Sequence, residues 1–234
     1  MSNTREHTHA IAFLLFQGAD ILDLTGPLEI LSSIPNTPTS SDLSQADFAF
    51  ETHLVARAPT IAASGRGCIT VATDSTVDEA IKRVAEFDIL VVPGGNVPIM
   101  QDLAKTNTPE VQFIQAFDAL PPKQDGDERV ILSVCTGALL LAAAGVLKGL
   151  RATTHHKFLD VMKAIDTSID VLGPEERAVG RYVDGGRNGN GTRVLTAGGV
   201  TCGLDASLYV AELKAGKPAA EYVAMMTEHE WKRA

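Results

Sequence analysis

The segment around Cys135 combines residue types that could do covalent chemistry. Val130-Ile-Leu-Ser-Val134 has the composition of a buried strand, Cys135-Thr-Gly137 can form a tight turn, and a Leu/Ala-rich run typical of a helix follows. A nucleophile elbow has this order of strand, turn and helix. A thiol at the start of a helix also experiences the positive end of the helix dipole, which lowers its pKa. We therefore predict that Cys135 is a nucleophile, the alternative being an inert buried cysteine.

A carboxylate and several backbone donors are expected near this cysteine. Asp23 follows an early apolar run, and a carboxyl group desolvated beside a thiolate would hold and donate a proton. The alternative is that Asp23 accepts N–H groups at the start of a helix. The backbone N–H of Thr136 would point to where negative charge develops on a substrate, and Pro93-Gly-Gly95 could bring a second donor from Gly94 or Gly95.

The sequence around the histidines and the other two cysteines gives less support for a role in catalysis. His155 follows what looks like another strand end and could line the site or act as a base for the thiol, although the start of a helix explains the pair His155-His156 equally well. Cys202 is expected in the core and Cys68 in an edge strand. No metal site is predicted, because the histidines are scattered and His229-Glu-Trp lacks the H-E-x-x-H spacing. No cofactor is predicted either.

Apolar runs alternate with helical patterns along the chain, which predicts a mostly parallel sheet covered by helices on both faces. The expected strands are Ile11–Phe16, Ala49–Val55, Asp88–Val92, Val130–Val134 and Val194–Ala197. The expected helices are Gly26–Ser33, Thr76–Val84, Pro109–Leu120, Thr136–Ala144, His156–Ile165 and Thr201–Leu213.

Residues 11–234 are expected to form one α/β domain after an N-terminal tail, residues 1–10. The polar segments 34–45 and 121–128 are interpreted as insertions, because the sheet pattern resumes after each. Residues 185–191 are rich in glycine and asparagine and predict the loop of a β-hairpin. The uncharged stretch 130–147 is long enough to raise the question of a membrane span, but its two halves differ in periodicity and fit a buried strand followed by a buried helix.

The composition narrows the classes of partner. The chain has 234 residues and a formal net charge of −9, so it has no basic surface for nucleic acid or for an anionic membrane. Three widely spaced cysteines without a C-x-x-C pair suit reduced thiols. The N-terminus lacks the features of a secretory signal. We expect a cytoplasmic protein.

Five segments in order resemble the ThiJ/PfpI superfamily and, more narrowly, its isonitrile hydratase branch. Thr136 is the residue that this branch carries after the cysteine, where other branches often have histidine or alanine. Similar segments occur in some AraC-like transcription regulators, but those continue into a basic helix-turn-helix region that we do not expect here. The segments are Asp23-Leu-Thr-Gly-Pro27, Ser133-Val-Cys-Thr-Gly137, Ala144-Gly-Val-Leu147, Arg151-Ala-Thr-Thr-His155 and Leu195-Thr-Ala-Gly-Gly199.

The resemblance implies a three-layer α/β/α sandwich with a flavodoxin-like sheet, a homodimer, and cofactor-independent hydration of an isonitrile to an N-substituted formamide. Cys135 would form a thioimidate with the small-molecule substrate, Asp23 would donate a proton and activate water, Thr136 would hold the geometry of the acid, and Gly95 would stabilise charge. Two alternatives remain open, a glyoxalase that converts methylglyoxal to lactate and a non-enzymatic cysteine redox sensor.

Overall fold

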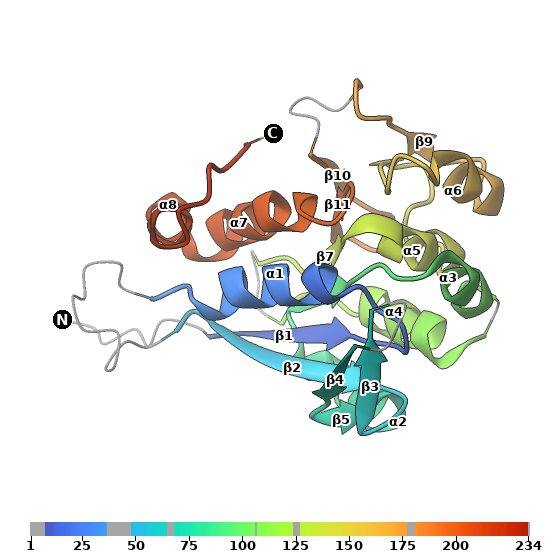
Figure 1. The fold of residues 1–234 in the computed structure, drawn as a ribbon, viewed down its shortest axis with the longest axis horizontal. Coiled ribbons are helices and arrows are strands. Elements are labelled where there is room, and N and C mark those ends of the chain that lie inside the picture. The colour runs from blue at the N-terminus through green and yellow to red at the C-terminus, as the bar shows by residue number, and fades with distance from the viewer. Residues whose placement is uncertain are drawn as a thin grey trace.

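A seven-stranded sheet forms the centre of the protein (Figure 1). The computed structural model describes residues 8–36, 48–64, 68–105, 107–123, 127–176 and 181–233. All neighbouring strands are parallel except the first pair, which confirms the predicted mostly parallel sheet. In order across the sheet the strands are β10 (Tyr182–Arg187), β11 (Arg193–Ala197), β7 (Val130–Ser133), β6 (Ile89–Val92), β1 (His9–Leu14), β2 (Phe50–Ala56) and β5 (Ser75–Thr76).

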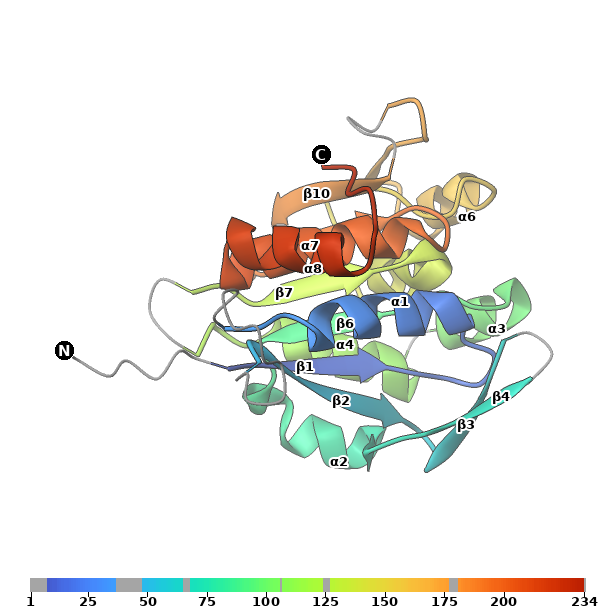
Figure 2. The same ribbon diagram turned by 60° about the vertical axis from the view of Figure 1, so that its left-hand side comes forward.

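The middle strands are almost entirely apolar because both faces of the sheet are covered. Every residue of β6 and β7 is buried. Helices α1 (Ile21–Ser32), α7 (Cys202–Ala215) and α8 (Lys217–Met226) lie together on one side of the sheet, whereas α2 (Val77–Lys82) and α4 (Pro109–Asp118) lie on the other (Figures 1 and 2). This is the expected three-layer arrangement, and the carboxyl ends of the parallel strands meet at one edge.

Several smaller elements were missed or placed differently. The short helix α3 (Val97–Leu103) was not predicted, and α6 (Leu159–Ile165), which follows α5 (Ala138–Ala143), begins three residues later than predicted. The hairpin of β3 (Thr60–Ala63) and β4 (Ile69–Ala72) and the pair β8 (Arg151–Ala152) and β9 (Asp170–Val171) form two further small sheets. These pieces are too short to carry a periodic pattern.

The start of α1 differs from the prediction in a way that matters for function. The helix begins at Ile21 rather than at Gly26, so Asp23 lies inside its first turn. The predicted start at Gly26 would have put Pro27 in the first helical turn, where proline is common. Pro27 instead lies within the helix. Helical hydrogen bonding begins before it, because the N–H of the buried Leu24 donates to the carbonyl of Asp20 at 3.2 Å.

Other boundaries also shift. The β10–β11 hairpin is confirmed, but β10 extends to Arg187 through an irregularity in register that accommodates two of the predicted loop glycines. Cys68 is exposed and precedes β4 by one residue, whereas Cys202 is buried as expected. β1 begins at His9, inside the stretch assigned to a tail. Parts of both predicted insertions, residues 37–45 and 124–126, lie outside the described residues. Within the described chain, no helix has the length and apolarity of a membrane span.

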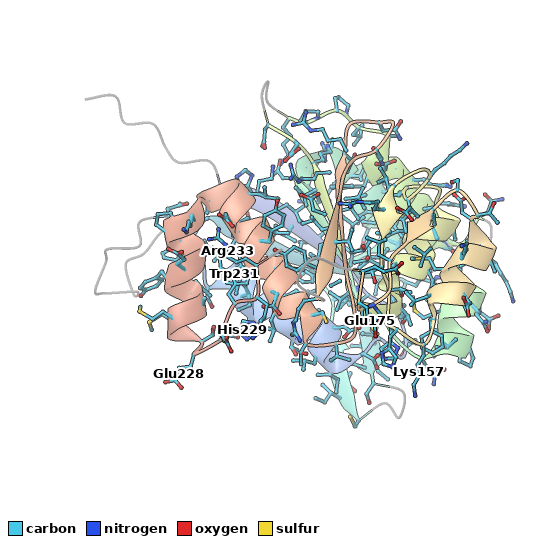
Figure 3. All side chains as sticks on the ribbon, turned by 90° about the horizontal axis from the view of Figure 1, so that it is seen from above. Lys157, Glu175, Glu228, His229, Trp231 and Arg233 are labelled. Atoms are coloured by element: carbon cyan, nitrogen blue, oxygen red, sulfur yellow. The ribbon has the colours of Figure 1, made fainter. Side chains whose placement is uncertain are left out.

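A buried carboxylate anchors the C-terminal segment beside α7. Asp205 is fully buried and accepts hydrogen bonds from Arg181 Nε at 2.6 Å and from the backbone N–H of Lys232 at 2.6 Å, and its other contact is His229 Nε2 at 3.1 Å. Figure 3 shows His229 and Trp231 together on this side of the molecule, opposite Lys157. Arg181 also donates to the carbonyl of Thr201, so this network fixes the turn that enters α7.

Candidate active site

Cys135 occupies a strained turn directly after β7. Its φ is +53°, in the left-handed region that non-glycine residues rarely adopt. Two long-range hydrogen bonds hold this backbone: Cys135 N–H donates to the carbonyl of Gly198 at 2.8 Å, and Thr154 Oγ1 donates to the carbonyl of Cys135 at 2.7 Å. Backbone strain of this kind persists only where surrounding contacts impose it, and it clusters at active sites. The geometry is that of the predicted nucleophile elbow.

The turn closes because Gly137 has no side chain. A Cβ at this position would lie 2.2 Å from the carbonyl oxygen of Val92 and 2.8 Å from that of Pro93. The short helical turn Cys135–Gly137 then leads into α5. The elbow and the end of β6 are therefore packed backbone against backbone, which places Cys135 beside the turn at Gly94 and Gly95.

Asp23 reaches this turn from α1, 71 positions away in sequence. Its Oδ2 accepts a hydrogen bond from the N–H of Gly94 at 3.0 Å. This carboxylate therefore binds the turn after β6 and does not cap the N-terminus of its own helix. Asp23 is fully buried, and its Oδ1 has no hydrogen-bond partner among the described residues. Burial, followed by the charge of Asp20, raises the pKa of Asp23 to about 7. Asp23 can therefore hold a proton near neutral pH, as expected.

The pKa of the thiol moves opposite to the sequence prediction. Burial of Cys135 and the charge of Asp23 raise the pKa of Cys135 to about 12, although the backbone N–H groups of Val200 and Thr136 favour the thiolate. The helix-dipole argument neglected the desolvation of the sulfur and the adjacent carboxylate. Cys135 is consequently a thiol at rest, and a base must take its proton when it reacts.

The roles predicted for the backbone donors need correction. Thr136 Oγ1 accepts from Gly95 N–H at 2.9 Å and donates to the carbonyl of Gly95 at 3.1 Å, so it holds the glycine turn rather than contacting Asp23. The N–H groups of Gly94 and Gly95 are already engaged by Asp23 and Thr136. The donors directed at the sulfur are those of Thr136, as predicted, and Val200, which the sequence analysis missed. Val200 also has a positive φ, of 28°.

Asp20 is a third acidic group at the site and was also missed. Its carboxylate, that of Asp23 and the sulfur of Cys135 all lie within 4.8 Å of one another. Asp20 is the N-cap residue of α1 and Asp23 is the third residue of the helix, and side chains at these two positions lie close together at a helix N-terminus. Their spacing would have been a usable signal if the helix had been predicted to start at Ile21.

His155 lies beside Asp20, and the charges that act on the thiol are those of Asp23 and Asp20. The His155 ring is half-buried, stacks on His156 with centroids 4.3 Å apart, and accepts the N–H of Lys157 at Nδ1. Burial, followed by the charge of His156, lowers the pKa of His155. We therefore place His155 at the rim of the site, where its charge acts on Asp20. We do not assign it as the base that activates Cys135.

Two clusters of the described chain have donors suited to a metal ion. Thiolate sulfur and carboxylate oxygen are zinc ligands, and the atoms of Asp20, Asp23 and Cys135 are close enough to share an ion. The second cluster, around Asp88 and Asp127 at the start of the strands, already has cations, because Lys123 and Lys214 pair with these two carboxylates at 2.8 and 2.5 Å.

Gly94→Ala is expected to disrupt the site. A Cβ there would lie 2.7 Å from Asp23 Oδ2, 2.7 Å from the backbone N of Thr136 and 2.8 Å from its Oγ1. The free energy of unfolding should fall by about 1–3 kcal/mol and kcat/KM by about 10- to 100-fold, measured by thermal denaturation and steady-state kinetics. Gly189→Ala is the control, because its Cβ meets nothing within 4 Å. Equal behaviour of the two variants would contradict the packing argument.

Comparison with known proteins identifies the family of this chain. The sequence profile of the DJ-1/PfpI family matches residues 9–205. The chain belongs to the DJ-1/PfpI family. Among its relatives, an isonitrile hydratase of Pseudomonas putida is 31% identical over 221 residues, which cover 94% of this chain and 78% of that protein. A deglycase of Pyrococcus abyssi is 32% identical over 127 residues, covering 53% of this chain and 69% of that protein.

The fold of this DJ-1/PfpI chain is shared by solved structures of low sequence identity. Drosophila melanogaster DJ-1beta superposes with a TM-score of 0.71 at 15% identity, covering 96% of this chain and 100% of that one. This likeness establishes the flavodoxin-like fold. Named relatives include an isonitrile hydratase and deglycases, so the chain is similar to enzymes, and its own reaction must be argued from the site.

Proposed function

We propose that this DJ-1/PfpI protein hydrates isonitriles, R–N≡C, to N-substituted formamides without a cofactor. The observation that carries the proposal is the buried pair of the Cys135 thiol and the Asp23 carboxyl at the carboxyl edge of the sheet. One group supplies a nucleophile and the other a carboxyl whose pKa, about 7, suits proton transfer in both directions. The likeness to the P. putida isonitrile hydratase over 94% of the chain supports the same reaction class.

In the first step, the sulfur of Cys135 adds to the terminal carbon of the isonitrile. Asp23, as a carboxylate, accepts the S–H proton while the C–S bond forms, and then delivers it to the same carbon. The product is the thioimidate R–N=CH–S–Cys135, with Asp23 again a carboxylate. The N–H groups of Thr136 and Val200 stabilise negative charge that develops on the sulfur.

In the second step, water adds to the thioimidate carbon. Asp23 removes a proton from the water and passes it to nitrogen, which gives R–NH–CH(OH)–S–Cys135. The hydroxyl proton then returns through Asp23 to the sulfur as the C–S bond breaks, releasing R–NH–CHO and the thiol. The sum is R–N≡C plus water to R–NH–CHO. The Gly94 N–H, in the turn that Thr136 holds, keeps the carboxyl in place throughout.

The pH dependence follows from the number of protons on the pair. The reaction begins with a protonated Cys135 and an ionised Asp23, so the pair holds one proton. Below the Asp23 pKa of about 7 both groups are protonated and the pair holds two protons. Above that pKa the pair holds one proton until the thiol pKa of about 12 is reached. We expect kcat/KM to rise with pH through a midpoint near 7, in a profile measured from about pH 5 to about pH 9. The other titratable groups facing the pair are Asp20 and, beside it, His155. A rate that falls across this window would contradict the mechanism.

Incubation with para-nitrophenyl isocyanide tests the reaction directly. Formation of the N-formamide, dependent on Cys135 and unchanged by EDTA, is the expected result. Production of lactate from methylglyoxal without formamide would instead favour a glyoxalase. A Cys135 that oxidises with peroxide in a protein that turns over neither compound would favour a redox sensor. Assembly as a homodimer, a single domain over residues 11–234 and a cytoplasmic location stay predictions.

A further inference from the structure

Asp20 occupies the solvent side of the reacting groups. Of the three groups that lie within 4.8 Å of one another, Cys135 and Asp23 are buried, and Asp20 is partly exposed. Asp20 immediately precedes α1, and its N–H donates to the carbonyl of Gly94 at 2.9 Å, which fixes its backbone against the glycine turn. Any molecule bonded to the sulfur of Cys135 must therefore lie within a few ångströms of the Asp20 carboxylate.

Within the described part of the chain, the charges around this position are predominantly negative. Asp20 and Asp23 both lie beside the sulfur. Burial raises the pKa of Asp20, and the charge of His155 opposes that rise. Protonation of His155 is disfavoured because its ring is partly buried next to His156 and Lys157. Lys157 is exposed, and in Figure 3 it lies at the edge of the molecule. Among the residues that the structure describes, the carboxylate of Asp20 is thus not neutralised by a fixed cation.

We propose that Asp20 selects the charge of the electrophile that reaches Cys135, admitting neutral and cationic molecules and rejecting those with an anionic group near the reacting carbon. For the proposed hydratase, this names the substrate class as isonitriles with a neutral or amine-bearing substituent rather than isocyano-carboxylates. Two unit charges held a few ångströms apart at a partly desolvated site are well within the screening length of physiological salt, about 8 Å. An effect of about tenfold or more on the bimolecular rate constant is expected.

Alkylation of Cys135 tests the charge selection without using any hydratase activity. Iodoacetamide and iodoacetate are similar in size and differ in charge, so the ratio of their rate constants is independent of the thiolate fraction. The ratio is measured by mass spectrometry in a Cys68→Ser, Cys202→Ala background and normalised to the ratio for a free thiol. Asp20→Asn is expected to lower the normalised ratio about tenfold, and Asp20→Glu to keep it.

Glu29→Gln is the matched control. Glu29 is exposed on the same helix, nine positions further on, so this change removes the same net charge without altering the mouth of the site. An unchanged ratio in Asp20→Asn, or an equal decrease in Glu29→Gln, would overturn the proposal. Retention of the ratio in Asp20→Glu separates the charge from a merely structural role of the side chain.

A matched set of alkyl isocyanides extends the test to turnover. The alkyl substituent of each compound ends in a methyl, a dimethylamino or a carboxylate group. The value of kcat/KM for each compound is compared between wild type and Asp20→Asn. We expect the carboxylate compound to be the poorest substrate of the wild type and to gain about tenfold in the variant, mainly through KM. If no isonitrile is hydrated, the proposed function fails while the alkylation ratio still decides the role of Asp20. If hydration occurs without charge discrimination, the charge selection fails alone.

Discussion

Cys135→Ala is expected to reduce isonitrile turnover by about 10³-fold or more, because covalent catalysis loses its nucleophile. Cys135→Ser should behave in the same way, since a hydroxyl is far less acidic than a thiol and is desolvated at the same buried position. Alanine has the same difficulty as cysteine at a φ of +53°. The backbone of the elbow should therefore be retained, and the melting temperature should stay within a few degrees of wild type.

Substitutions of the other two cysteines are the controls that show whether the loss of turnover is specific to Cys135. Cys68 is exposed, and Cys202 is buried at the start of α7 and does not belong to the cluster of Asp20, Asp23 and Cys135, so Cys68→Ser and Cys202→Ala should keep turnover within about twofold of wild type. Initial rates of formamide production and far-UV circular dichroism are the two readouts. Substantial turnover in folded Cys135→Ala would remove the nucleophile from the mechanism, and a thioimidate on Cys135 would then not be detected by mass spectrometry.

Asp23→Asn is expected to lower turnover by about 10²- to 10³-fold, because an amide cannot carry the proton between sulfur, carbon and water. The same change should make Cys135 more reactive toward iodoacetamide at mildly alkaline pH. The charge of Asp23 is the second cause, after burial, of the raised thiol pKa, and the asparagine is neutral. Turnover and alkylation should thus change in opposite directions, which a general disruption of the site would not produce.

The difference in stability between wild type and Asp23→Asn should also depend on pH. The pKa of Asp23 rises from 3.8 to about 7 on folding, so between these values the native state holds a proton that the unfolded state has lost. The free energy of unfolding of the wild type therefore decreases as pH rises through this window, by at most about 4 kcal/mol at about 1.4 kcal/mol per pKa unit. The variant lacks this dependence and should be the more stable protein above about pH 7.

Denaturant unfolding at two pH values measures this difference. The gap between Asp23→Asn and wild type should be small near pH 4 and largest near pH 8. Asp102→Asn is the control, since the Asp102 side chain is 73% exposed and its removal should leave the pH dependence as in wild type. A variant that is equally destabilised at both pH values would show that Asp23 is a structural hydrogen-bond acceptor for Gly94 and not a titrating group of the site.

Local patterns were sufficient to predict the main elements of the sheet. The five expected strands correspond to β1, β2, β6, β7 and β11, with ends within two residues, because a buried parallel strand reads as a continuous apolar run. Short elements such as β9 and α3 carry no such run and were missed. The start of α1 was predicted five residues too late. The helix extends in the N-terminal direction beyond Pro27, where Asp23 and Leu24 are buried.

The sequence by itself determined that Cys135 follows a strand at a glycine-containing turn and that Asp23 follows another, and parallel strands bring such positions to one edge. Only the tertiary structure decided how the groups act there. The Gly94 and Gly95 N–H groups are used by Asp23 and Thr136, Val200 arrives from a distant turn, and Asp20 joins the pair. Proton affinities depend on burial and on charges from residues far apart in the chain. Those are properties of packing, so the thiol pKa rises where the local helix argument predicted a fall.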